Sequence, residues 1–192
     1  MRAFRSLILV RHSAVQMDPD HPSHKWVLSA NGRSRSISFA KRLLPYAPSL
    51  FISSQEPKAL ETGRLMSGEL GVPHQSAPGL QEQDRTRTPF FKSEQAFRAA
   101  VEEFFSHPEN LVLGQETAAQ ALARFNQAVC REVDLYPSEN VVFVTHGTVM
   151  TLFVRHHNPQ LESMDFWSSL EMPCAVILNY PDLSFHSLLL RK

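Results

Sequence analysis

Two histidines follow apolar runs that have the length and composition of buried strands. His12 comes after the run 7–10, with Arg11 between them, and His146 comes just after the run 141–144. Because ligands of open α/β sheets bind at the carboxyl ends of the strands, we expect both histidines to face one crevice. A neutral imidazole nitrogen is a competent nucleophile toward phosphorus. The pair therefore predicts phosphoryl transfer, with His12 as the covalent nucleophile.

The residues beside these histidines are suited to binding phosphate. Arg11 carries a planar, permanently charged guanidinium that matches phosphate oxygens. Gly147 opens a predicted helix, whose first N–H groups favour an anion. Phosphoryl transfer depends mostly on positioning and electrostatics, and His146 can hydrogen-bond the transferring group. Each histidine alone is more often a packing residue, so the prediction rests on the pairing of the two strand ends.

The elements that must position these residues alternate between strand and helix. The predicted strands are 7–10, 50–52 and 141–144, and the predicted helices are 29–44, 56–70, 94–105, 118–133 and 147–157. Residues 175–180 and 185–190 predict a hairpin at a sheet edge. This order is typical of a three-layer α/β/α sandwich with a mostly parallel central sheet. We expect one domain over residues 1–192, with an excursion at about 78–114 that forms a cap or lid.

The composition excludes several classes of function. Lys and Arg together number 19, as do Asp and Glu, so no excess of positive charge predicts nucleic acid or an anionic membrane as a partner. The apolar stretch near the N-terminus is too short for a signal sequence or a membrane span, which favours a cytoplasmic protein. The cysteines, Cys130 and Cys174, have no metal-binding spacing, and no glycine-rich nucleotide loop occurs. We therefore expect neither a metal nor another cofactor, although the pairs His21/His24 and His156/His157 leave a weak metal alternative.

Six segments, taken in order, resemble the motifs of the histidine phosphatase superfamily, the group that contains cofactor-dependent phosphoglycerate mutase. Leu-Val-Arg-His-Ser at 9–13 is similar to its Leu-Val-Arg-His-Gly signature. The other matching segments are 28–32, 52–62, 79–82, 114–117 and 144–147. The resemblance spans nearly the whole chain and implies a phosphoglycerate mutase-like fold.

The resemblance also implies a role for each matching residue. His12 would become phosphohistidine, while Arg11, Lys58 and His146 would bind the phosphoryl oxygens. Glu82 would protonate the leaving oxygen and then activate water. A general acid at neutral pH needs a raised pKa, which burial or a neighbouring carboxylate can provide. Asp84, two residues further on, is the substitute candidate for this role.

Two positions depart from the family pattern. Ser13 replaces the glycine after the nucleophile, and Lys58 stands where the family usually has its second arginine. Lysine keeps the charge but loses bidentate phosphate binding, so we expect weaker or altered activity. Lys58 can also be interpreted as an exposed helix residue. Ser13, Trp26 and Arg85 are further pocket candidates, since they lie in the segments expected to border the crevice.

The leading hypothesis is a histidine acid-type phosphatase that hydrolyses a small phosphorylated substrate. A mutase is the nearer rival, although the chain is short for one. The rival from another class is a phospho-ligand-binding module with weakened catalysis, which the substitutions at Ser13 and Lys58 suggest. We expect a monomer or a homodimer.

Overall fold

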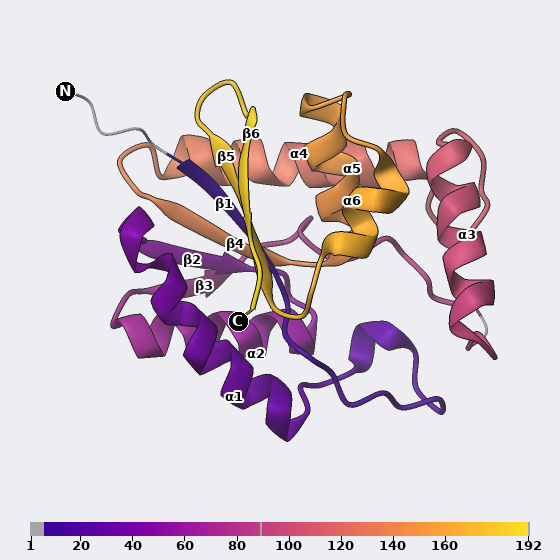
Figure 1. The fold of residues 1–192 in the computed structure, drawn as a ribbon, viewed down its shortest axis with the longest axis horizontal. Coiled ribbons are helices and arrows are strands. Elements are labelled where there is room, and N and C mark those ends of the chain that lie inside the picture. Colours follow the sequence, from indigo (N-terminus) through magenta and orange to yellow (C-terminus); the bar gives the residue numbers. More distant parts are fainter. Residues whose placement is uncertain (1–5, 89, 192) are drawn as a thin grey trace.

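A computed structural model describes residues 6–88 and 90–191 of the chain (Figure 1). The N-terminal residues 1–5, on which part of the argument against a signal sequence rests, lie outside the described residues. So does Pro89, within the expected excursion. None of the helices in the described ranges combines the length and the apolar character needed to cross a membrane.

Six strands form one mixed sheet in the order β3-β2-β4-β1-β5-β6. Their bounds are β1 Ser6–Arg11, β2 Leu50–Ser53, β3 His74–Ser76, β4 Val141–Thr145, β5 Cys174–Asn179 and β6 Phe185–Leu189. The first four strands are parallel, whereas β5 runs antiparallel to β1 and pairs with β6 as a hairpin at the sheet edge. The mostly parallel sheet and the edge hairpin were both predicted. The short strand β3 was not, because His-Gln-Ser has no apolar pattern.

Helices cover both faces of this sheet, which makes the predicted three layers (Figure 1). The helix bounds are α1 Ala30–Ala40, α2 Pro57–Leu70, α3 Glu94–Ser106, α4 Ala118–Leu135, α5 Gly147–His157 and α6 Ser163–Ser169, with 3-10 turns η1 Ser23–Lys25 and η2 Lys41–Tyr46. Side chains of α1 and α2 pack on one face, and those of α4, α5 and α6 pack on the other. The central strands are apolar throughout because both of their faces are buried.

The first helix departs from the predicted range 29–44. It ends at Ala40 and continues as η2, which includes Pro45. The apolar spacing was also partly wrong, because Ile37 and Leu44 are 39% and 57% exposed. Phe39 and Leu43 face the sheet instead. The chain tightens into 3-10 geometry before proline, which cannot donate the next helical hydrogen bond.

The excursion at 78–114 contains one regular helix, α3, as predicted. Val101 and Phe104 of α3 are buried together with Leu113 and Ala118, and Trp167 of α6 packs against this cluster. Figure 1 shows α3 at one end of the molecule, beside α6. The excursion therefore packs through a small apolar cluster that it shares with α4, α5 and α6.

Gly32, near the start of α1, allows the helix to lie against the segment that follows β1. A β-carbon on Gly32 would stand 1.9 Å from the carbonyl oxygen of Ala14. We expect Gly32→Ala to lower the free energy of unfolding by about 2 kcal/mol or more. The matched control is Gly68→Ala in α2, where a β-carbon meets no atom within 4 Å, so stability should rise by up to about 1 kcal/mol. Urea unfolding of both variants measures the contrast, and equal effects would contradict the close approach at Gly32.

Candidate active site

Parallel pairing of β1 with β4 brings the two strand-end histidines together. Arg11 and Thr145 are register partners, and the backbone N–H of His12 donates to the Thr145 carbonyl at 2.9 Å. The imidazole rings of His12 and His146 lie 5.2 Å apart, centroid to centroid, at an interplanar angle of 63°. The two histidines thus occupy one site at the carboxyl edge of the sheet.

His12 is held as a neutral imidazole with one nitrogen available. Its Nδ1 lies 2.8 Å from the Ser13 carbonyl oxygen, which can only accept a hydrogen bond. Nδ1 therefore carries the proton and Nε2 keeps its lone pair. Burial, followed by the charges of His146, Lys58 and Arg11, holds the pKa of His12 well below its usual range. The residue is 7% exposed, so this neutral nucleophile is also largely screened from water.

His146 is fully buried at the N-cap of α5. Its Nε2 lies 2.9 Å from the Ser54 hydroxyl oxygen, while its Nδ1 has no partner among the described residues. Burial and the charge of Lys58 hold its pKa well below the usual range, although the charge of Glu82 acts in the other direction. When the Ser54 hydroxyl donates to Nε2, the proton is on Nδ1, which leaves a buried donor for a ligand oxygen.

Arg11 lies against the first residue of α5. One of its terminal nitrogens donates to the Leu170 carbonyl, and its Nε has no partner in the described part of the chain. A β-carbon on Gly147 would stand 3.1 Å from that Nε, so a glycine here allows the guanidinium to approach the helix. Arg11 therefore places a positive charge, with an unpartnered Nε, beside the start of α5.

Lys58 is buried among these groups rather than exposed on α2. Its side chain is 6% exposed, and its Nζ donates to the Ser23 carbonyl at 2.7 Å and to Glu56 Oε2 at 2.5 Å. An ammonium has three N–H donors, so one remains for a ligand. Lys58 thus lies in the histidine cluster and is not the exposed helix residue of the alternative interpretation; its binding of phosphate stays a prediction.

Glu56 is a site residue that the sequence analysis missed. Its Oε1 accepts the backbone N–H of Glu82 at 2.9 Å and lies 3.6 Å from His146 Nε2, while its Oε2 binds Lys58. The sequence did hold a signal, since Glu-Pro-Lys places an acid two residues before the cation. Pro57 begins α2 and leaves Glu56 at its N-cap, from which the carboxylate reaches the site.

The carboxylate of Glu82 caps the first turn of α5. It accepts the backbone N–H groups of Thr148 at 3.2 Å and Val149 at 3.1 Å, and that of Gln83 at 3.1 Å. Burial raises the pKa of Glu82, but the nearby positive charges, Arg85 foremost, and the hydrogen bonds outweigh burial, so the pKa lies below its usual range. The expected raised pKa is therefore wrong for the ligand-free site. A bound phosphoryl group would raise the pKa of Glu82 by like-charge repulsion.

Two arginines hold the irregular segment that carries Glu82. Arg124 of α4 donates to the carbonyls of Gly79, Gln81 and Glu82 and pairs with Glu116 at 2.8 Å. Arg85 donates to the Thr148 hydroxyl at 2.6 Å and lies 4.0 Å from Glu82 Oε2. Arg85 thereby ties the segment to α5.

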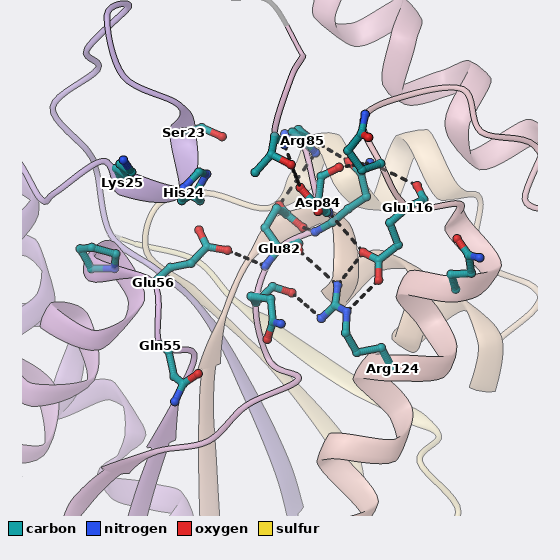
Figure 2. Close-up of a pocket in the computed structure, with 16 residues that line it drawn as sticks. Ser23, His24, Lys25, Gln55, Glu56, Glu82, Asp84, Arg85, Glu116 and Arg124 are labelled. Atoms are coloured by element: carbon teal, nitrogen blue, oxygen red, sulfur yellow. Dashed lines mark hydrogen bonds and ion pairs between the residues drawn. The ribbon is translucent and has the colours of Figure 1, made fainter.

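A cleft of about 690 Å³ adjoins the histidine cluster, and Glu56 and Glu82 belong to both. Its lining is Ser23, His24, Lys25, Gln55, Glu56, Pro57, Gln81, Glu82, Gln83, Asp84, Arg85, Thr86, Gln115, Glu116, Gln120 and Arg124. Figure 2 shows η1 on one side of the cleft and the Glu116–Arg124 pair on the other. Pro57 is the one apolar side chain in this lining, so the cleft is suited to a polar ligand.

Two of the predicted pocket residues do not line the cleft. Ser13 is buried, and its hydroxyl donates to the Gly32 carbonyl at 2.7 Å, which ties the end of β1 to α1. Trp26 donates its indole N–H to the carbonyls of Asp18 and His21, at 2.9 Å each, and so stabilises its own loop. Arg85 and Asp84, in contrast, do line the cleft. In the described ranges, no cluster of three or more His, Cys, Asp or Glu residues is arranged to hold a metal ion.

The lowered histidine pKa values predict how stability changes with pH. Below about pH 6.5 the histidines of the unfolded chain take up protons, whereas His12 and His146 stay neutral in the folded protein. The free energy of unfolding therefore decreases as the pH is lowered. We expect His146→Gln to show a shallower fall than the wild type, and His107→Gln, at an exposed position, to match the wild type. Urea unfolding at several pH values measures the slopes. Parallel slopes for His146→Gln and the wild type would contradict the prediction.

Comparison with known proteins supports the resemblance to the histidine phosphatase superfamily that the sequence motifs indicated. The family model of the histidine phosphatase superfamily (branch 1) matches residues 7–189. A mycobacterial glucosyl-3-phosphoglycerate phosphatase superposes with a TM-score of 0.71 at 19% identity, covering 98% of this chain and 97% of that one. Bacillus stearothermophilus YhfR gives 0.68 at 22% identity, covering 94% of each chain. A mutant phosphoserine phosphatase from Entamoeba histolytica gives 0.69 at 14% identity, covering 96% of each chain.

Comparison with curated protein sequences gave no significant match. The structural likenesses, all at low identity, establish the shared fold. The family match covers nearly the whole chain and includes both strand-end histidine motifs. The chain therefore belongs to branch 1 of the histidine phosphatase superfamily.

Proposed function

We propose that this protein is a phosphatase of the histidine acid type, which hydrolyses a small phosphate monoester through a phosphohistidine on His12. The observation that carries the proposal is the hydrogen bond from Nδ1 of His12 to the Ser13 carbonyl. It leaves the Nε2 lone pair free in a buried cluster that also holds Arg11 and Lys58. A nucleophile that stays neutral among cations is what attack on a phosphate ester requires.

In the first step, Nε2 of His12 bonds to phosphorus and the ester P–O bond breaks. The imidazole becomes cationic, and the Ser13 carbonyl stabilises the proton on Nδ1. Arg11 Nε and the Nδ1–H of His146, both without protein partners in the described chain, donate to the phosphoryl oxygens, and Lys58 adds its third N–H. Stabilisation of this kind acts on the transition state because the donors are already in place.

Glu82 acts first as the general acid and then as the general base. A bound phosphate ester raises the pKa of Glu82, whose carboxylate then takes up a proton from the phosphate hydroxyl or from water and gives it to the leaving oxygen. The resulting carboxylate then accepts a proton from water, whose oxygen bonds to phosphorus as the P–N bond breaks. Phosphate leaves and His12 returns to its neutral state. Position supports this role, since Glu82 belongs to both the cleft and the histidine cluster.

The lining of the cleft supports a small and polar leaving group. Apart from Pro57, its side chains are amides, hydroxyls, charged groups and the imidazole of His24, with no Phe, Tyr or Trp among them. Such walls hydrogen-bond to hydroxyl, amino or carboxyl groups and gain little from burying an apolar surface. Two of the structural relatives are named for esters of this kind, glucosyl-3-phosphoglycerate and phosphoserine.

Replacement of the nucleophile tests the proposal directly. We expect the wild type to release inorganic phosphate from a panel of polar phosphate monoesters, and His12→Ala to lower kcat/KM about a thousandfold or more. His107→Ala, at an exposed position, should retain the wild-type rate. No release by a wild type that still binds phosphate esters would favour the binding module. Phosphate retained on an isomer of the substrate would favour the mutase, and activity that survives His12→Ala would overturn the mechanism.

The proton donor can be tested separately through the leaving group. Glu82→Gln should slow hydrolysis of an alkyl phosphate by about a hundredfold, because the poor leaving group needs a proton. Hydrolysis of p-nitrophenyl phosphate should slow much less, because its leaving group departs as a stable anion. The comparison uses kcat/KM for both substrates, because kcat/KM reports the step in which the leaving group departs and not the hydrolysis of phosphohistidine that both substrates share. An equal loss on the two substrates would place Glu82 in positioning rather than in proton transfer.

A further inference from the structure

The geometry points to Glu56 as a specificity-determining residue that makes the site select the monoanionic form of the phosphate group over the dianion. This inference rests on the proposed function, since it concerns the phosphate that His12 receives. Lys58, the lysine proposed to bind the phosphate, forms an ion pair with the carboxylate of Glu56.

The cluster around the two histidines carries a small net positive charge. The cations that act on the two histidines are Arg11, Lys58 and Arg85. Glu56 and Glu82 oppose them, and both histidines are neutral at neutral pH. Three cations against two carboxylates leave one net positive charge among these described residues. That charge balances a monoanion, whereas a dianion leaves a buried excess of negative charge.

Two hydrogen bonds hold the carboxylate of Glu56 in place. Lys58 binds one of its oxygens at 2.5 Å, and the Glu82 N–H binds the other at 2.9 Å. The first oxygen thus occupies one donor of the ammonium, and the second lies 3.6 Å from His146 Nε2. A carboxylate among the donors that would hold phosphoryl oxygens repels a fully ionised phosphate. It can accept a hydrogen bond from a phosphate that keeps its hydroxyl.

The groups around Glu56 come from every element packed against it. Arg11 and His12 lie at the end of β1, His146 at the start of α5, and Glu82 and Arg85 on the 78–93 segment. The turn η1 contributes the Ser23 carbonyl to Lys58 and places His24 and Lys25 on the cleft wall. Of these, His24 is the titratable cleft residue whose protonation would also favour anions at low pH, so the test must control for it.

A monoanionic substrate also supplies the proton that the reaction needs. The charge of Arg85 and the hydrogen bonds to Glu82 favour its carboxylate form, so Glu82 accepts the hydroxyl proton of the phosphate and passes it to the leaving oxygen. The N–P bond forms as the ester P–O bond breaks. The single negative charge of the substrate remains on the site as a phosphoryl dianion bonded to an imidazolium. The alcohol departs neutral, so atoms and charge balance.

Binding of inorganic phosphate, measured by calorimetry, tests this without turnover. The two conditions lie about one pH unit below and one above the second pKa of phosphate, which changes the monoanion fraction about tenfold. We expect the wild-type affinity to fall by about the same factor between them. The phosphate affinity of Glu56→Gln should fall by less than about threefold between the two pH values. At the higher pH this variant should bind phosphate about tenfold more tightly than the wild type.

Two control variants separate Glu56 from other causes. Glu69→Gln removes a carboxylate of the same helix, one that pairs with Lys41 at 3.1 Å away from the cluster, and His24→Gln removes the titratable histidine of the cleft wall. Both should keep the wild-type tenfold fall. Thermal unfolding of each variant verifies that it is folded.

The outcomes are distinct. An unchanged or weaker affinity of folded Glu56→Gln at the higher pH would overturn the inference, because Glu56 would then only position Lys58. A wild type that binds phosphate equally well at both pH values would overturn it even if Glu56→Gln does not fold. If the phosphate affinity of His24→Gln does not fall between the two pH values, the preference for the monoanion belongs to His24 and not to Glu56. Failure of the wild type to bind phosphate at either pH would overturn the proposed function and this inference together, whereas loss of monoanion preference alone leaves the proposed function standing.

Discussion

The parallel pairing of β1 with β4 is the constraint on which the site depends. The last hydrogen bond of this pairing, from the His12 N–H to the Thr145 carbonyl, holds the carboxyl ends of the two strands side by side. Both histidines follow immediately, so their rings meet 5.2 Å apart without any flexible connection. The start of α5 follows His146 directly, and its N–H groups therefore lie at the same edge as Arg11.

Burial of this edge decides the chemistry of the groups on it. Desolvation disfavours the imidazolium forms of His12 and His146, and the neighbouring cations act in the same direction. The result is a neutral nucleophile beside permanent positive charge. Burial also explains why Lys58 has a partner, since an unpaired ammonium in this place would cost several kcal/mol. Glu56 meets that requirement and at the same time sets the net charge that a ligand encounters.

The irregular segment that carries Glu82 is placed by hydrogen bonds rather than by secondary structure. Three of its carbonyls accept from Arg124, and the carboxylate of Glu82 accepts from the first turn of α5. The same hydrogen bonds that position Glu82 also favour its ionised form. Position and acidity are therefore coupled, and a proton on Glu82 depends on what occupies the site.

The sequence by itself determined the layered fold, the mostly parallel sheet and the expectation that His12 and His146 face one crevice. Apolar runs and their alternation with helices along the chain are visible in the sequence, and they indicate where the carboxyl ends of the strands lie. It also singled out Arg11 and Lys58 through the motifs at 9–13 and 52–62, and Arg85 through its position in a segment expected to border the crevice. Only the tertiary structure decided the contacts of Glu56 with Lys58 and Glu82 and the direction of the Glu82 pKa shift. It also placed Ser13 and Trp26 away from the cleft. These depend on contacts between residues far apart in the chain, and on the burial that those contacts create, which no local pattern encodes.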